Sequence, residues 1–471
     1  MIDEKMWRWG IIGLMLLYWG AAVWMGLRLP ALATPNELLN YEYIAVMRQI
    51  RGLPNRGLVD SEVRYTEWHQ PPVYFVWAAL SGLGVRVERS AVNPPPPIEV
   101  EKNPFYTSTA RGNLNPAVHM GPETWPLLYI SRWAAGLMGL VAMAGLYRVG
   151  KMMYGGGLGL VVASVVAFQP NFVHLSGSVN NDMPLTAVSA LTLAYAIYLV
   201  RRRLDEPASF FWLGLLCAAA ILTKANGVFV LALAGGAGLS QLWHYRDGRL
   251  MVKSLGAGLA GLLPLWGAWL WLNAVRMKDA LGVEGSLPVD RVLALKPWDF
   301  VALGPYGGEI WRSVWLDWSA GGVGYGSDLV YGVSLAVLGV GFGLLLWRGR
   351  RVLGREWGVV LLGIVAISYL YLAVKTLMVK EAGFLTPEGR WWLPVWPGVA
   401  WLWGVGVWGA VPRRWRSVVS GLVAIGPVVG VYWLLGDPFA GVVSAGGAVG
   451  VFGRGGRVYG GGVAVVGRGG V

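Results

Sequence analysis

Long apolar segments joined by short polar loops constrain this chain more than any other feature. A bilayer core of about 30 Å is crossed by about 20 mostly apolar residues in a helix. By that measure the sequence contains eleven candidate spans, at residues 8–28, 125–148, 155–172, 184–201, 209–223, 226–243, 254–275, 327–347, 357–375, 391–411 and 417–435. Only helices and closed barrels satisfy the backbone inside lipid, so the pattern predicts an all-α polytopic membrane protein.

The composition agrees with this class and excludes several others. Of the 471 residues, 55% are hydrophobic and only 14% are charged, which argues against an array of soluble domains. The formal net charge of +13 is concentrated in turns between spans, where anionic lipid is the simpler partner, and we expect no nucleic acid. The single cysteine, Cys217, excludes an intrachain disulfide and a thiolate metal cluster.

The basic residues also predict an orientation. If the N-terminus is cytoplasmic, every cytoplasmic connection carries lysine or arginine, whereas the outer loop 173–183 has neither. The cytoplasmic groups are Lys5/Arg8, Arg148/Lys151, Arg201–Arg203, Arg246/Arg249/Lys253, Arg348/Arg350/Arg351/Arg355 and Arg413/Arg414/Arg416. Two long loops, 29–124 and 276–326, then face outward. We therefore expect a multi-pass protein of the cell membrane whose active face is periplasmic or extracellular.

The first outer loop has structure of its own. Residues 37–50 follow a proline and precede Gly52 and Pro54, which predicts an amphipathic helix along the membrane surface. Residues 73–83 form a second apolar segment that is too short to cross. Ala31-Leu32-Ala33 resembles a signal-peptide cleavage site, but the apolar stretch before it is longer than an ordinary signal and favours an uncleaved helix.

The chain is predicted to contain one membrane domain followed by a tail. The domain covers residues 1–435. Residues 436–471 form a glycine-rich tail, with 13 glycines in the last 35 positions. This composition cannot bury a core, so we expect the tail to be flexible.

Polar residues that suggest chemistry gather at the predicted outer face. They lie in four segments, residues 34–37, 67–74, 168–182 and 387–394, with Arg132 and Lys224 besides. Arg132 is about two helical turns inside a span, where an ionised side chain usually faces a cavity or a partner. Cations there could neutralise a phosphate leaving group while a carboxylate takes a proton from an acceptor hydroxyl.

Simpler interpretations of the same residues stay open. Glu37 fits the first turn of a helix because of the helix dipole, and Asp182 could cap the helix that follows it. Lys224 and Arg390 could extend to lipid headgroups. Histidines at such positions are more often hydrogen-bonding groups than ligands, so we predict no metal site.

The order of these features resembles the membrane-embedded glycosyltransferases of the GT-C superfamily, close to the protein O-mannosyltransferases and lipid A aminoarabinose transferases. In that class an acidic motif follows the first span, and a His-Pro-Pro segment with an aromatic residue comes later in the same loop. Here Asn36-Glu37 and the segment from His69 to Tyr74 stand at those places. Further matching segments, in order, are Tyr129–Arg132, Asn180–Asp182, Thr223-Lys224, Trp315–Trp318 and Gly389–Pro394. The resemblance covers about residues 1–411.

The resemblance implies transfer of a sugar from a polyprenyl-phosphate donor to a glycan, lipid or protein acceptor whose identity is unknown. Asn36 stands where the family has its catalytic aspartate and cannot act as a base, so the candidate catalytic carboxylates are Glu37 or, alternatively, Asp182, unless this copy is impaired. Substrate binding falls to Asn36, His69, Arg132, Asn181, Lys224 and Arg390. A divalent cation requirement is left open. Two alternatives remain: a transporter or flippase for a lipid-linked or anionic solute, and a non-catalytic relative.

Overall fold

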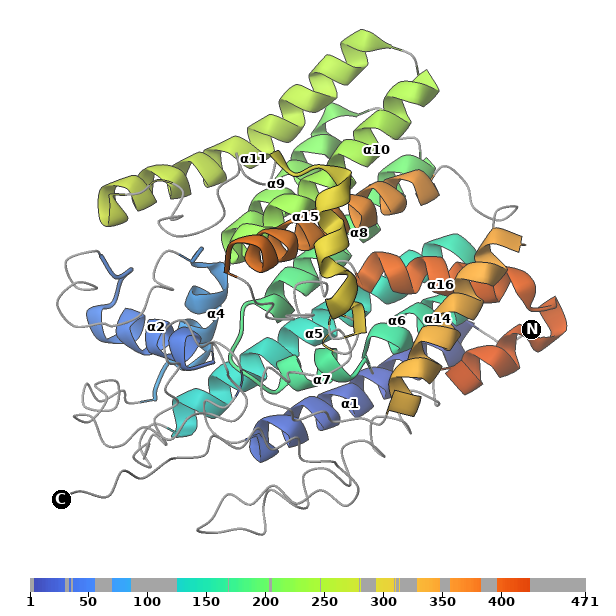
Figure 1. Cartoon of the computed structure of the whole chain (residues 1–471), viewed down its shortest axis with the longest axis horizontal. Coiled ribbons are helices and arrows are strands. Elements are labelled where there is room, and N and C mark those ends of the chain that lie inside the picture. The colour runs from blue at the N-terminus through green and yellow to red at the C-terminus, as the bar shows by residue number, and fades with distance from the viewer. Residues whose placement is uncertain are drawn as a thin grey trace, which may run out of the picture.

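The structure, a computed structural model, describes most of the predicted membrane domain. The described residues are 4–29, 34, 37–55, 70–85, 125–167, 169–202, 206–245, 247–278, 280, 294–308, 310, 313, 328–347, 356–382 and 396–423. Within these ranges every regular element is a helix, which confirms the predicted all-α class (Figure 1).

The first half of the chain forms α1 (Glu4–Arg28), α2 (Glu37–Ile50), α4 (Val73–Ser81), α5 (Trp125–Tyr154), α6 (Gly156–Ala167), α7 (Pro170–Ser176), α8 (Asp182–Arg202) and α9 (Pro207–Thr223). The second half forms η3 (Ala225–Phe229), α10 (Val230–Tyr245), α11 (Gly248–Met277), η4 (Pro297–Tyr306), α14 (Asp328–Trp347), α15 (Glu356–Ala382), α16 (Trp396–Ala410) and η7 (Arg413–Trp415).

Four of the described helices are long and apolar enough to cross a bilayer, namely α1, α5, α8 and α11. A fifth span is formed if α6 and α7, which meet at an angle of 70°, count as one. Most other predicted spans coincide with helices that are shorter or only partly described, so the predicted number of eleven is not confirmed. The tail 436–471 lies outside the described residues.

The span predicted at 155–172 is broken rather than continuous. Gln169 has extended backbone, and its side chain accepts a hydrogen bond from the Phe172 amide, which makes it the N-cap of α7. Pro170 then occupies the first turn, where its missing N–H leaves no helical bond unmade. The sequence Gln169-Pro170 indicates a helix start, but the apolar residues on both sides favour one continuous span.

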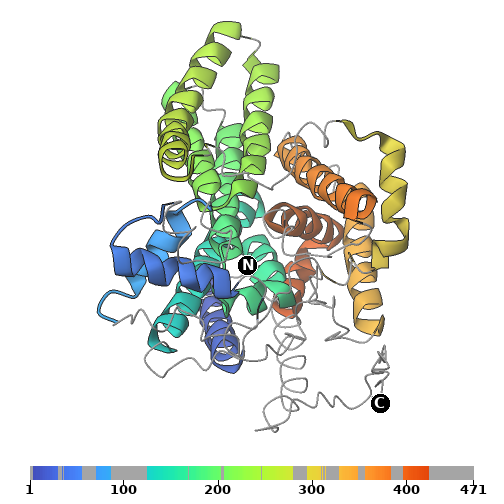
Figure 2. The ribbon, with the colours of Figure 1, turned by 60° about the vertical axis from the view of Figure 1, so that its left-hand side comes forward.

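Helix α5 occupies the centre of the bundle and packs against α1, α6 and α8 (Figure 1). Small residues allow the close approach that drives helix association in lipid. A methyl group added at Gly139 would collide with the Tyr18 hydroxyl of α1, and one at Gly214 of α9 would collide with the Gly258 carbonyl of α11. Figure 2 shows α10 and α11 on one side of this centre and α14 and α15 on another.

The predicted helices of the first outer loop are present as α2 and α4, and α2 has the predicted bounds. However, α2 does not lie on a surface with one polar side exposed. Glu37, Asn40 and Glu42 are buried together with its apolar residues Tyr41 and Ile44. The enclosed polar side of α2 therefore needs partners from elsewhere in the protein.

The bundle has two different ends. At one end α1 begins and α5 and α8 finish, and there Lys151 pairs with Glu4 at 2.5 Å while Arg201 donates to the Met152 carbonyl at 2.8 Å. At the other end α1 and α11 finish and α8 begins. This second end, which we call the polar end, carries the buried polar residues of α2 and the α7–α8 connection.

Candidate functional site

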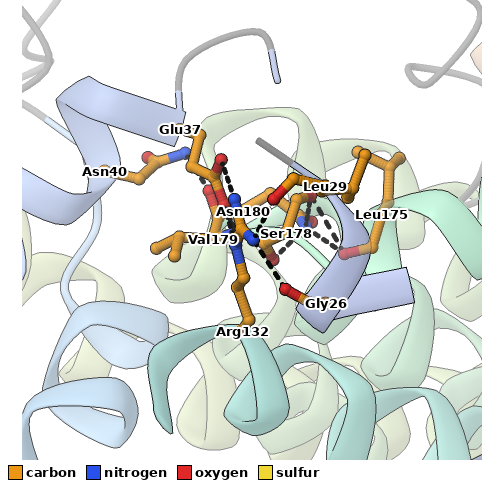
Figure 3. Close-up of polar contacts among 9 residues, drawn as sticks. All are labelled: Gly26, Leu29, Glu37, Asn40, Arg132, Leu175, Ser178, Val179 and Asn180. Carbon is orange, nitrogen blue, oxygen red and sulfur yellow. Dashed lines mark hydrogen bonds and ion pairs between the residues drawn. The ribbon is translucent and has the colours of Figure 1, made fainter. Parts of the chain in front are cut away.

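A buried ion pair between Glu37 and Arg132 organises the polar end (Figure 3). The Nε and Nη2 atoms of Arg132 donate to the two carboxylate oxygens of Glu37, each at 2.8 Å. Both side chains are 0% exposed. A two-point contact of this kind fixes direction as well as distance, so Glu37 at the start of α2 is locked onto α5.

Arg132 also completes the end of α1. Its Nη1 atom donates to the carbonyls of Gly26 at 2.7 Å and Leu29 at 2.9 Å. The last carbonyls of a helix have no partner within the helix, and inside a protein they need one from elsewhere. One arginine thus joins α1, α2 and α5, which explains why an ionised residue is tolerated inside a span.

Helix α2 holds the α7–α8 connection by the peptide groups of Val179 (Figure 3). Oε1 of Glu37 accepts a hydrogen bond from the Val179 amide at 2.9 Å, and Nδ2 of Asn40 donates to the Val179 carbonyl at 3.1 Å. Both side chains come from one face of α2, three residues apart. The connection from Gly177 to Asn181 is therefore fixed to the first outer loop.

A second buried ion pair follows directly. Asp182, in the first turn of α8, accepts from the Lys224 amine at 2.6 Å through Oδ1. Lys224 lies between α9 and η3, in the connection between the spans predicted at residues 209–223 and 226–243. The other oxygen of Asp182, Oδ2, is buried and has no hydrogen-bond partner among the described residues. Asp182 comes only three positions after Val179 in the chain.

Asp182 does not cap its own helix. The α8 cap is Asn180, whose Oδ1 accepts from the amides of Asp182 at 3.1 Å and Met183 at 3.0 Å. The interpretation of Asp182 as a simple cap is therefore wrong, and its carboxylate is available to Lys224.

The polar contacts continue toward α11. Nδ2 of Asn181 donates to the Gln70 side chain at 3.4 Å, and the Tyr43 hydroxyl donates to the Gln70 carbonyl, also at 3.4 Å. Arg276 then reaches the Tyr43 hydroxyl at 3.4 Å and the Pro54 carbonyl at 2.9 Å. It also lies over the ring of Trp269. These contacts link the end of α11 to the same loop that holds Glu37.

Glu42 is a buried carboxyl group of a different kind. It is 6% exposed, its Oε2 atom has no hydrogen-bond partner among the described residues, and burial raises its pKa to about 8. Nearby in sequence, burial also raises the pKa of Tyr43, although Arg276 opposes the shift. Glu42 is thus mostly protonated at neutral pH, whereas the Glu37 carboxylate has a cation beside it.

The structure brings together five of the eight predicted site residues, Glu37, Arg132, Asn181, Asp182 and Lys224, at the polar end. The other three, Asn36, His69 and Arg390, lie outside the described residues. Among the described side chains, no three His, Cys, Asp or Glu residues gather at metal-binding distance.

Sequence reasoning missed Asn180, Asn40 and Arg276. Arg276 is buried in the last turn of α11, yet by position it resembles any cation at a helix end. Nothing in one sequence singles it out, because its partners lie in the distant first loop. Asn180 is different, because an asparagine two residues before the first turn of a helix is a recognisable cap signal.

Comparison with known proteins supports the resemblance that the motifs indicate. Residues 129–271 match the family described as dolichyl-phosphate-mannose-protein mannosyltransferase. No curated protein matches the chain.

The solved structures similar to this chain include the following three. ArnT from Cupriavidus metallidurans in the apo state has 17% identity and a TM-score of 0.52, covering 94% of this chain and 66% of that one. The same ArnT bound to undecaprenyl phosphate has 14% identity and a TM-score of 0.48, covering 93% and 74%. The apo oligosaccharyltransferase of Archaeoglobus fulgidus has 12% identity and a TM-score of 0.44, covering 88% and 55%.

The chain thus spans slightly less than two thirds of the apo ArnT chain, and at this identity the likeness concerns the fold. The matched family segment begins within α5 and ends within α11, and it includes Arg132, Asp182 and Lys224. The chain therefore shares the helical membrane-protein fold of ArnT, and its residues 129–271 resemble the matched mannosyltransferase family, in agreement with the motifs.

Proposed function

We propose that this chain is a glycosyltransferase that moves a sugar from a polyprenyl-phosphate donor to an acceptor hydroxyl at the outer face of the cytoplasmic membrane. The matched family description names a dolichyl-phosphate sugar donor, and ArnT, which shares the fold, has been solved with undecaprenyl phosphate. The polar end of the bundle supplies carboxylates and cations suited to such a donor.

The Asp182–Lys224 pair is the observation that carries this proposal. Asp182 has a charged partner on one oxygen and none on the other, so Oδ2 can accept a proton from an acceptor hydroxyl. Asp182 also lies in the first turn of α8, where the partial positive charge of the helix N-terminus makes an acidic side chain stabilising. We assign the general base to Asp182, with Lys224 beside it to stabilise negative charge on the phosphate leaving group.

Glu37 has a different role in this proposal. Both of its oxygens are engaged by Arg132, and one also accepts from Val179, so a reacting hydroxyl would have to displace these contacts. We assign Glu37 and Arg132 to positioning. Asn36, His69, Asn181 and Arg390 remain predicted substrate ligands, and the alternative that Glu37 is the base is tested below.

The orientation rests on charge. The end opposite the site carries Lys151, Arg201 and Arg413, which supports a cytoplasmic location for that end. The polar end would then face the periplasm or the cell exterior, where lipid-linked sugar donors are used after they cross the membrane.

The test uses the purified full chain in liposomes, with polyprenyl-phosphate mannose as donor and a lipid extract as acceptor. Turnover is measured as the release of free polyprenyl phosphate. Asp182→Asn should lower kcat by about 10²–10⁴-fold, as removal of a general base does, without unfolding the protein. Asp299→Asn is the matched control. Asp299 also accepts from a lysine, Lys380, at 2.6 Å, but this pair is partly exposed and belongs to η4 and α15. Equal activity of Asp182→Asn and the wild type would remove the base assignment.

The transporter alternative has one supporting observation, the break between α6 and α7, because transporters use discontinuous helices. Transporter sites lie near the bilayer midplane, however, whereas the buried ion pairs here lie where the helices end. Transport of a lipid-linked sugar across the liposome bilayer, with no release of polyprenyl phosphate, would favour the transporter over the enzyme.

A further inference from the structure

Asn180 uses its whole side chain on the two helices beside it (Figure 3). Its Nδ2 atom donates to the Leu175 carbonyl at 2.5 Å and to the Ser178 carbonyl at 2.9 Å. Its Oδ1 atom accepts from the first amides of α8. One amide group therefore holds the last turn of α7 with one end and the first turn of α8 with the other.

The opposite side of the same connection is held by α2. Glu37 and Asn40 bond the amide and the carbonyl of Val179, the residue directly before Asn180. The connection between α7 and α8 is thus fixed from two sides, by α2 from outside and by Asn180 from within. Asp182 comes two residues after Asn180, so its direction depends on both sets of contacts.

Burial makes these contacts hard to replace. Asn180 is 1% exposed, and Ser178 and Leu175 are fully buried, so water has little access if the amide is lost. The Leu175 carbonyl would keep the Ser178 amide and hydroxyl as donors, but the Ser178 carbonyl would lose its bond from Asn180. Because an unpaired buried carbonyl is costly, the chain would shift to find new partners. A shift of about 1 Å in a reacting group can lower a rate by about 10²-fold.

We propose that Asn180 is a positioning residue that aims the free oxygen of Asp182 at the acceptor hydroxyl. The inference rests on the proposed function, since Asp182 is the general base there. Asn180 touches neither substrate nor reacting atoms in this account. It acts by holding α7 and α8 at one angle, so that Oδ1 of Asp182 accepts from Lys224 while the buried Oδ2 has no hydrogen-bond partner among the described residues.

Two substitutions separate positioning from mere stabilisation. Serine caps helices about as well as asparagine does, but its hydroxyl is too short to reach the Leu175 carbonyl as well. Asn180→Ser should therefore lose less melting temperature than Asn180→Ala, because it keeps the cap of α8, while kcat for polyprenyl-phosphate mannose falls at least 10-fold and KM changes less than threefold. Asn180→Ala loses both the cap and the link to α7, so it should lose stability as well and have the lower kcat of the two.

The matched control is Asp247→Ala. Asp247 caps α11 at the opposite end of the bundle, accepting from the amides of Arg249 at 2.8 Å and Leu250 at 3.3 Å. Losing this cap should lower the melting temperature by an amount similar to the cap loss in Asn180→Ala, with kcat unchanged.

The outcomes are distinct. If Asn180→Ser keeps kcat within about threefold of the wild type while Asp182→Asn is inactive, the proposed function stands and the positioning role is overturned. If Asn180→Ser lowers kcat but Asp182→Asn does not, Asn180 does not act through Asp182 and the inference fails in this form. A wild-type chain that does not turn over any polyprenyl-phosphate sugar would remove the proposed function and this inference together.

Discussion

The two ion pairs at the polar end treat their carboxylates in opposite ways. Glu37 accepts hydrogen bonds on both carboxylate oxygens, two from Arg132 and one from a backbone amide. Asp182 has one bond to Lys224 and one bare oxygen. A carboxylate with hydrogen bonds on both oxygens holds the structure together, whereas one with an unbonded oxygen can still take a proton on that oxygen. Under the proposed function, this difference distinguishes the positioning carboxylate, Glu37, from the general base, Asp182, although both side chains are buried.

The largest expected effect comes from breaking the Glu37–Arg132 pair. Glu37→Gln leaves the Arg132 charge buried with no counter-ion, and losing one partner of a buried pair costs about 3–5 kcal/mol of folding free energy. Thermal unfolding of the detergent-solubilised protein should show this loss directly. Replacing both residues, as Glu37→Leu with Arg132→Met, should recover much of the stability. If Glu37→Gln keeps its melting temperature but loses activity, Glu37 is the base and the comparison is reversed.

A change at Lys224 tests the second ion pair, Asp182–Lys224, in the same way. Lys224→Met should raise KM for the donor and lower kcat, together about 10²-fold in kcat/KM, because the phosphate loses its cation and Asp182 loses its partner. Stability should also fall, because Asp182 is left without its partner, but less than in Glu37→Gln, since the Lys224 side chain is 11% exposed whereas the Glu37–Arg132 pair is fully buried. Lys224→Arg is the control that keeps the charge. A silent Lys224→Met variant would mean that this pair lies outside the reaction.

The sequence predicted the parts of this site better than their pairing. Arg132 was identified because a charge two turns inside a span is costly, and α2 because proline and glycine mark its ends. The partner of Arg132, however, lies 95 residues away on another helix, and no local pattern encodes that distance. Asn180 had a readable cap signal that the neighbouring Asp182 obscured. The break at Gln169 was likewise hidden by apolar residues on both sides.

A smaller effect is expected at the clamp on Val179. Asn40→Ala removes one hydrogen bond to a buried carbonyl, which is worth about 1–3 kcal/mol when the carbonyl is left without a partner. Activity should fall severalfold at most, because Glu37 still holds the Val179 amide. Thermal unfolding and kcat measured on the same preparation would test this. A loss as large as that in Asp182→Asn would give α2 a direct role in the reaction.

The smallest effect concerns the third carboxyl group, Glu42, and depends on pH. Its pKa is raised by burial from its ordinary value of 4.5 to about 8, so the folded state binds more protons than the unfolded state between these values. Stability from this group is therefore greatest below about pH 4.5 and falls as pH rises toward 8. Glu42→Gln should remove this dependence and raise the melting temperature by a few degrees at pH 8 and above. An unchanged pH profile would mean that Glu42 is charged in the folded protein.

The bonds from Arg132 to the end of α1 bear on how the chain is made. If the N-terminus is cytoplasmic, as proposed, translation delivers α1 well before α5, and Glu37 crosses the membrane before its cation is synthesised. Arg132 must then enter lipid at an insertion cost of up to about 2.5–3.5 kcal/mol. Its partners, the Glu37 carboxylate and the carbonyls of Gly26 and Leu29, are then already in place. The order of synthesis thus supplies an anchor that draws α5 to its final depth and register against α1.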